Sequence, residues 1–373
     1  MCTSLTYTDA NGGIYFGRTL ELDVEEPYFV TYVPAGTAFH SDAEGSEPLR
    51  FETKQPFIAV TAPIRMPTAE NPLGPSDLKA SEGMNAAGLS FSLLAYPTSA
   101  PGKSAGEVTK ALLDASDLGS WLLSQFATVD EVKAGLAEQP VHLTRLALVG
   151  DATFPFHIVV HDKGGASIVI EWHDGREKVY DNPVGVMTNG PDFPWHLTNL
   201  RNWTHLTNVN HSAARFGGLE VSQPDSGIAS AALPGSNTSV GRFIRAVYYS
   251  SFTEKTDDPD KALLNLARIM NNFDRPRGAT IDPPEASGGE GMKFQGIGGD
   301  DGNPPTEYTS WTNLSDLGRG RFLLRTYGAF NYTRFDLATL SESDQLHLLP
   351  TAGLDPLGGD GTEALLSAKL PGA

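Results

Sequence analysis

The chain begins MCTSLTYTDANGGIYFGRTLEL, residues 1–22. Residues 4–8 and 14–22 have the composition of β-strands, and the Asn-Gly-Gly between them at 11–13 is a strong signal for a tight hairpin, because Asn and Gly tolerate positive φ. The hairpin would bring the second strand back beside Cys2, which is the only cysteine of the chain. We therefore interpret the rest of the sequence outward from this terminus.

Cys2 directly follows the initiator methionine. A small residue at position 2 allows an aminopeptidase to remove Met1, and removal would leave a cysteine with both a thiol and a free α-amine. An α-amine titrates at about 7.7–8.0, so it can act as a general base for the thiol of the same residue. The hairpin also brings Arg18 and Glu21 near the terminus. This combination favours the chemistry of an N-terminal nucleophile hydrolase.

The composition excludes several classes of protein. The chain has 373 residues, of which 40% are hydrophobic, and a net charge of −18 that argues against nucleic acid or an anionic membrane as a partner. No apolar run reaches the roughly 18–20 residues that span a bilayer. No signal peptide is evident as written. We therefore expect a cytoplasmic protein, or a periplasmic one if Met1 replaces a removed signal peptide.

The order of predicted elements indicates the fold class. Strands come first, two helices follow, strands return, and two more helices precede the last strands. This order predicts an α+β protein with two antiparallel sheets packed together and helices outside. We expect one domain over residues 2–349 and a mobile tail over 350–373. The clearest β segment is a strand meander over 154–188. Helices are expected from Ser104 towards Leu113, from the capping box at Thr128 to before Pro140, over 239–252 and over 259–272.

Six blocks in chain order resemble the choloylglycine hydrolase family, which groups bile salt hydrolases with penicillin V acylases among the N-terminal nucleophile hydrolases. The blocks are MCTSLTY, FGRTLEL, EGMNAAGLSF, GVMTNGPDFPWHLTNL, LPGSNTSVGRFIR and TEYTSWTNL. The resemblance runs from Cys2 to about Asp336. It implies a four-layer αββα sandwich, a small-molecule amide substrate, no cofactor, and a homo-oligomer, a tetramer in many members.

The resemblance also assigns roles around the terminus. Cys2 falls on the family's nucleophile, and Arg18 falls on the arginine that contacts its sulfur. A guanidinium beside a thiol favours the reactive thiolate. The family usually has aspartate three residues after this arginine, where it binds the α-amine. Glu21 occupies that position here, and Asp23 is the alternative.

Further roles fall on residues distant in the sequence. Asn189 matches the family's oxyanion-hole asparagine, and Arg242 matches an arginine that supports the site. The second oxyanion donor of the family comes from the strand after the GMN block, at a position that is Ala95 here with Tyr96 next. A backbone N–H can donate whatever the side chain, so we expect the donor at Ala95 or Tyr96.

These departures resemble the divergent branch of the family found in Gram-negative bacteria, some of whose members also cleave acyl-homoserine lactones. We rank penicillin V first as substrate, acyl-homoserine lactones second and conjugated bile salts third. An inactive homologue that binds an acyl ligand is the alternative. His157 and His161 would share one face of a strand, but no third ligand is evident, so we expect no metal site.

Overall fold

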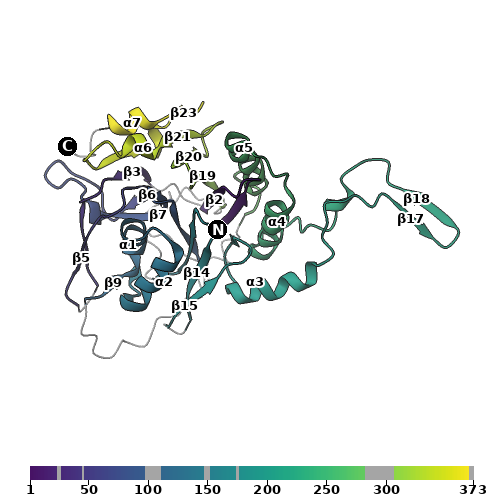
Figure 1. Ribbon diagram of the computed structural model, residues 1–373, viewed down its shortest axis with the longest axis horizontal. Coiled ribbons are helices and arrows are strands. Elements are labelled where there is room, and N and C mark those ends of the chain that lie inside the picture. The colour runs from purple at the N-terminus through teal and green to yellow at the C-terminus, as the bar shows by residue number, and fades with distance from the viewer. Residues whose placement is uncertain are drawn as a thin grey trace.

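The computed structural model describes residues 1–22, 27–43, 46–96, 111–146, 152–173, 176–281 and 306–368. They form two large sheets, which are antiparallel except for the short β21–β23 pair (Figure 1). The seven-stranded sheet has the order β16 (Val186–Met187), β1 (Cys2–Thr8), β2 (Ile14–Leu22), β19 (Tyr308–Asp316), β20 (Arg321–Thr326), β21 (Thr333–Asp336) and β23 (Gly359–Asp360). The eight-stranded sheet has the order β15 (Arg176–Asp181), β14 (Ser167–His173), β13 (Phe156–Asp162), β8 (Leu89–Ala95), β7 (Leu78–Asn85), β6 (Phe57–Pro63), β3 (Phe29–Val33) and β22 (His347–Pro350).

Helices and short strand pairs surround the sheets. The helices of the described residues are α1 (Leu118–Gln125), α2 (Val129–Glu138), α3 (Phe193–Asn199), α4 (Ser239–Phe252), α5 (Pro259–Met270), α6 (Leu337–Leu340) and α7 (Thr362–Leu366). Within those residues, no helix has the length and apolar character needed to cross a membrane. The short pairs are β4 (Ala38–Ser41) with β5 (Leu49–Glu52), β9 (Leu113–Asp114) with β10 (Val141–His142), β11 (Arg145–Leu146) with β12 (Ala152–Thr153), and β17 (Ala213–Phe216) with β18 (Leu219–Ser222).

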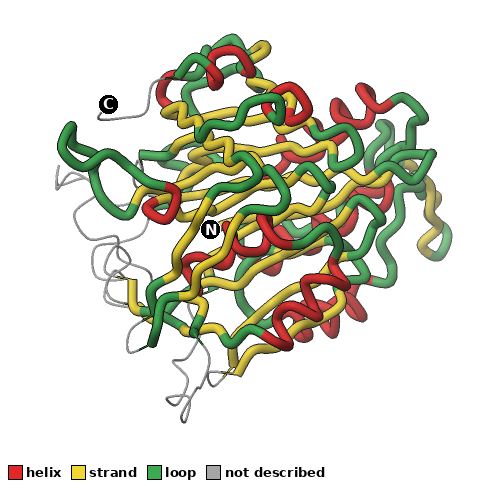
Figure 2. Tube along the Cα trace, turned by 60° about the vertical axis from the view of Figure 1, so that its left-hand side comes forward, coloured by secondary structure: helices red, strands yellow, loops and turns green. Residues whose placement is uncertain are grey.

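The two faces of the eight-stranded sheet belong to different hydrophobic cores, because successive side chains of a strand point to opposite faces. On β6, Phe57 and Ala59 pack in the core that contains α1 and α2. Ile58 and Val60 pack in the core shared with the seven-stranded sheet, α4 and α5. The layers therefore run helices, sheet, sheet, helices (Figure 2), and the predicted αββα sandwich is confirmed.

The amino-terminal hairpin forms as predicted and lies among the strands (Figures 1 and 2). Gly12 has φ of 85°, which the turn requires. The Asp9 carboxylate accepts from the backbone N–H of Asn11 at 2.9 Å and of Gly13 at 2.7 Å, so the turn is closed by a side chain as well as by backbone. Gly17 lies against α5, where a Cβ would come within 2.8 Å of the Met270 sulfur. β2 can therefore lie close to that helix.

Two expectations need correction, and a third lies mostly outside the described residues. The helix predicted from Ser104 towards Leu113 falls mostly on residues 97–110, which lie outside the described residues, and Leu113 itself belongs to β9. The described helix that precedes α2 is α1. The stretch 207–235 is rich in Ser and Gly, a composition that predicts irregular structure, but it contains the β17–β18 hairpin, which Figure 1 shows projecting from the body. The predicted mobile tail instead contains β23 and α7, whose Leu365 is fully buried; residues 369–373 lie outside the described chain.

Candidate active site

Cys2 begins β1 and is 1% exposed. The hairpin register pairs Cys2 with Leu20 and Ser4 with Arg18, so the side chains of Cys2 and Arg18 point to the same face of the sheet. The Arg18 guanidinium donates from Nη2 to the Cys2 sulfur at 3.3 Å. Two residues 16 positions apart are thus brought into contact by the turn between them.

Arg18 also occupies a split in the opposite sheet. The pairing of β7 with β8 ends at Glu82 and Ser92. Beyond that point the Arg18 guanidinium donates to Ser81 O on β7 at 2.8 Å and to Leu93 O on β8. It therefore takes the place of ladder hydrogen bonds and holds the two strands apart.

Glu82 is a buried partner of Arg18 that the sequence analysis did not assign, although it lies in the EGMN block. Its Oε2 accepts from Arg18 Nη1 at 3.4 Å and from Ser92 Oγ at 2.6 Å. Burial raises the pKa of the Glu82 carboxyl to about 8, and the attraction of Arg18 opposes this shift only in part. On its other side, the Arg18 guanidinium lies 4.8 Å from the centroid of the Trp311 ring.

Asn189 follows β16, and hydrogen bonds fix its side-chain amide. The Oδ1 atom accepts from the Cys2 backbone N–H at 2.9 Å and from Arg242 Nη2 at 2.7 Å. The Nδ2 atom donates to Ala95 O at 2.7 Å, which leaves its second N–H for another acceptor. Because two donors face Oδ1 and a carbonyl faces Nδ2, the contacts allow only this orientation of the amide.

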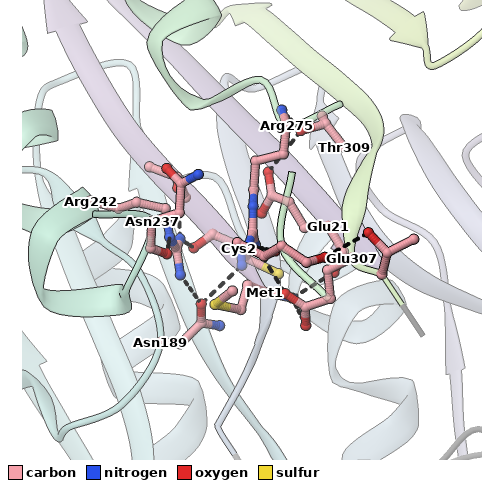
Figure 3. Close-up of polar contacts among 12 residues, drawn as sticks. Met1, Cys2, Glu21, Asn189, Asn237, Arg242, Arg275, Glu307 and Thr309 are labelled. Carbon is pink, nitrogen blue, oxygen red and sulfur yellow. Dashed lines mark hydrogen bonds and ion pairs between the residues drawn. The ribbon is translucent and has the colours of Figure 1, made fainter. Parts of the chain in front are cut away.

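Arg242, from α4, connects Cys2 to Asn189 (Figure 3). It is fully buried and donates to Cys2 O, to Thr3 Oγ1 at 2.8 Å and to Asn237 O at 3.0 Å. Burial lowers the pKa of Arg242, and the charge of Glu21 opposes this shift. The predicted supporting arginine therefore lies behind the cysteine backbone rather than beside its sulfur.

The two candidates for a backbone oxyanion donor differ in their contacts. The Tyr96 N–H donates to Pro155 O at 2.8 Å and is therefore occupied. Antiparallel pairs alternate between bonded and non-bonded, so at Ala95, one residue earlier, the N–H and C=O both turn away from β13. The Ala95 carbonyl accepts from Asn189 on that side. The Ala95 N–H thus faces the split between β7 and β8.

Met1 is attached to Cys2, and the terminal ammonium lies near the site (Figure 3). It donates to Glu21 O at 2.5 Å and lies 3.3 Å from Glu307 Oε1. The Glu21 carboxylate is fully buried; its Oε1 accepts from Thr309 Oγ1 at 3.3 Å, and its Oε2 has no partner among the described residues. Burial raises the pKa of Glu21. The alternative carboxylate, Asp23, lies outside the described residues.

A pocket of about 330 Å³ opens at Cys2. It occupies the split between the strands, and Ser81, Leu93 and Ala95 line it together with Arg18. Its remaining walls are largely apolar and include three aromatic rings, those of Tyr28, Phe154 and Phe156. The arrangement places the thiol of Cys2 and the backbone of Ala95 at the wall of an apolar cavity, and the Asn189 amide donates to Ala95 O beside it. Acyl transfer from an apolar substrate requires such a combination of groups.

Known proteins share this architecture. The model of a family described as linear amide C–N hydrolases, choloylglycine hydrolase family, matches residues 2–288. A conjugated bile acid hydrolase of Lactobacillus acidophilus is 32% identical over 274 residues, which cover 73% of this chain and 80% of that protein.

Two solved structures have the same fold. A mutant conjugated bile acid hydrolase from Clostridium perfringens has a TM-score of 0.75 at 21% identity, covering 94% of this chain and 96% of its own. Penicillin V acylase from Agrobacterium tumefaciens has a TM-score of 0.74 at 20% identity, covering 99% and 98%. The chain is an enzyme of the choloylglycine hydrolase family of linear amide C–N hydrolases.

Proposed function

We propose that the chain, once Met1 is removed, is an N-terminal cysteine amidohydrolase that cleaves linear, non-peptide amides through an acyl-thioester. One observation carries the proposal: the Cys2 sulfur lies 3.3 Å from the Arg18 guanidinium at the wall of an apolar pocket. The positive charge favours the thiolate, and the pocket can hold an acyl group against it.

The reaction then follows from the groups around the sulfur. The Cys2 sulfur attacks the amide carbonyl carbon, and the α-amine accepts the thiol proton. The tetrahedral intermediate collapses by breaking the C–N bond, and the α-ammonium gives its proton to the leaving amine. Water then attacks the thioester and loses a proton to the α-amine. Cleavage of the C–S bond releases the carboxylic acid and restores the thiolate.

The oxyanion in this scheme is held by Asn189 Nδ2 and the Ala95 N–H. The Asn189 amide is fixed by Arg242 and by the Cys2 nitrogen, so it needs no reorganisation when charge develops. The Ala95 N–H is preferred to that of Tyr96, since the latter donates to Pro155 O.

We assign Glu21 to the α-amine, because its carboxylate is buried near the terminus and its Oε2 has no partner within the described part of the chain. Asp23 is the competing carboxylate. Glu21→Gln and Asp23→Asn separate the two: the substitution that abolishes turnover in Met1-free protein identifies the carboxylate. Loss of activity in Asp23→Asn alone would overturn the assignment to Glu21.

We rank phenoxymethylpenicillin first among substrates, acyl-homoserine lactones second and conjugated bile salts third. The aromatic rings of Tyr28, Phe154 and Phe156 in the pocket suit a phenoxy acyl group. The relatives include both a conjugated bile acid hydrolase and a penicillin V acylase. Side-by-side kcat/KM values for the three amides test the ranking, and a bile salt turned over fastest would reverse it.

Intact-mass measurement tests the mechanism directly. We expect the mature protein to lack Met1 and to gain the mass of the acyl group when it is exposed to substrate and quenched in acid. Cys2→Ala should form no adduct and should be inactive. Full amidase activity in Met1-free Cys2→Ala would overturn the proposal, and retained Met1 without any adduct would favour an inactive acyl-binding homologue.

We also propose that the protein is a homo-oligomer, a tetramer by family resemblance. The β17–β18 hairpin projects from the body and exposes apolar side chains, with Phe216 70% and Leu219 62% exposed (Figure 1). Such a surface favours a protein contact. Light scattering after chromatography should give a particle mass that is a multiple of the chain mass. This mass should be smaller for the double variant Phe216→Asp/Leu219→Asp. Phe330→Asp, at a site 82% exposed elsewhere, is the control.

A further inference from the structure

A buried ion pair lies behind Asn189 and has no part in the chemistry described so far. His157 on β13 and Glu171 on β14 are both fully buried, with 3.0 Å between His157 Nδ1 and Glu171 Oε1. His157 Nε2 lies 2.9 Å from the carbonyl oxygen of Thr188, the residue before Asn189. The pair therefore connects the interior of one sheet to the peptide that carries the oxyanion donor.

Both ring nitrogens of His157 face oxygen atoms. Nδ1 lies 3.0 Å from Glu171 Oε1 and Nε2 lies 2.9 Å from Thr188 O, so the two ends of the ring are held by different elements. Burial alone would raise the pKa of Glu171, but its hydrogen bond to His157 and the charge of that ring lower it below its ordinary value.

Glu171 also holds the far end of the same turn. Its two carboxylate oxygens accept from the backbone N–H of Phe193 at 3.1 and 3.2 Å, at the start of α3. One end of the segment 188–193 is therefore held by His157, and the other by Glu171. Between them, the Asn189 backbone donates to Ser239 Oγ at 2.9 Å and accepts from His196 Nε2 at 3.0 Å.

We propose that His157 and Glu171 are positioning residues that fix the turn 188–193, so that the amide of Asn189 points at the developing oxyanion. The inference rests on the proposed role of Asn189 in the reaction. The turn leaves β16 after Met187, so its carbonyls receive side-chain N–H groups instead of ladder hydrogen bonds. The Tyr96 ring stacks on the His157 ring, with 4.9 Å between the ring centroids and 5° between the ring planes. This stacking holds the His157 ring in its orientation.

His161 provides the internal comparison. It lies four residues along the same strand on the same face and is 1% exposed, but neither of its ring nitrogens has a partner among the described residues. A buried histidine at this depth therefore does not require an ion pair. The pairing of His157 reflects what lies next to it, which is the turn that carries Asn189.

The test replaces each histidine by phenylalanine in Met1-free protein and measures turnover of the amide that the parent cleaves fastest. His157→Phe keeps the ring but removes both hydrogen bonds, and we expect kcat to fall roughly 10- to 100-fold with KM nearly unchanged, because an oxyanion donor acts only in the transition state. His161→Phe should keep the parent kcat. Alkylation of Cys2 by iodoacetamide should keep its parent rate in both, since Arg18 is untouched.

A neutral pair provides the rescue. His157→Gln alone leaves a carbonyl facing the Glu171 carboxylate, whereas His157→Gln with Glu171→Gln restores a complementary donor and acceptor. We expect the double variant to recover most of the kcat lost in the single one. If His157→Phe does not fold, this comparison decides the matter.

Either of two results would overturn the inference. One is a folded His157→Phe with kcat within twofold of the parent, and the other is a double variant no faster than His157→Gln. Activity in Cys2→Ala would instead reject the proposed function itself, so the two failures are distinguishable.

Discussion

His161 is a neutral imidazole in the core between the two sheets, and its burial predicts how stability depends on pH. The ring lies 4.9 Å from that of Phe16 and has no hydrogen-bond partner in the described chain. Burial lowers its pKa from 6.5 to about 3. Between these two pH values the unfolded chain therefore binds a proton at His161 and the folded chain does not, so stability is lost as the pH falls from about 6.5 towards 3.

The size of the effect follows from this shift. Each unit of difference in pKa corresponds to about 1.4 kcal/mol. At pH 7.5 both states hold a neutral ring, so the contribution is near zero. At pH 4.5 the unfolded state is favoured by about 2.7 kcal/mol. His161→Phe removes this penalty. The free energy of unfolding of the variant minus that of the parent should therefore be about 2.7 kcal/mol larger at pH 4.5 than at pH 7.5.

Urea unfolding of parent and variant at the two pH values measures this double difference, in which all other titrating groups cancel. His211→Ala, at an exposed histidine, is the control: its difference in the free energy of unfolding from the parent should be the same at both pH values. The reasoning would be refuted if the stability difference between parent and His161→Phe were the same at pH 4.5 and 7.5 to within about 0.5 kcal/mol.

Further substitutions test the site and the fold. Asn189→Ala should lower kcat by about 10²–10³-fold, as loss of an oxyanion donor does. An unchanged kcat with only an altered KM in steady-state assays would contradict this. Arg18→Lys should lower kcat/KM by roughly 100-fold or more and slow iodoacetamide alkylation, because one ammonium nitrogen cannot replace two guanidinium nitrogens, of which Nη1 donates to Ser81 O and Nη2 to the Cys2 sulfur and Leu93 O; an unchanged alkylation rate would argue against it. Asp258→Ala should cost about 1 kcal/mol in urea unfolding, because the side chain caps α5 through two backbone N–H groups, while Asp257→Ala next to it should cost little.

Local signals in the sequence were sufficient for part of the site. The contact between Cys2 and Arg18 follows from a hairpin whose turn residues are explicit, since a fixed turn sets the register of both strands. The capping box at Thr128 begins α2 as expected, with the Thr128 hydroxyl accepting from the Glu131 N–H. Asn189 and Arg242 required the family resemblance, because nothing local distinguishes them from a turn residue and a helix arginine.

The rest depends on tertiary contacts that a single sequence does not display. Asp117, before α1, directs its carboxylate to Ser41 and Lys79 instead of capping the helix, so the usual start signal is missing. Glu82 meets Arg18 across two sheets, and His157 meets Glu171 through the pairing of β13 with β14. Such pairs become visible only when strand register and sheet stacking are known.

The position of Arg18 between β7 and β8 links two properties that enzymes usually vary separately. The same guanidinium that contacts the Cys2 sulfur also keeps the strands apart, and the pocket beside Cys2 is the space it maintains. Shortening this side chain would allow the ladder to close beyond Glu82 and Ser92 and fill that space. Evolution towards a larger or smaller acyl group therefore has little freedom at Arg18 itself, and changes in substrate range should accumulate at other lining residues, such as Tyr28, Phe154 and Phe156.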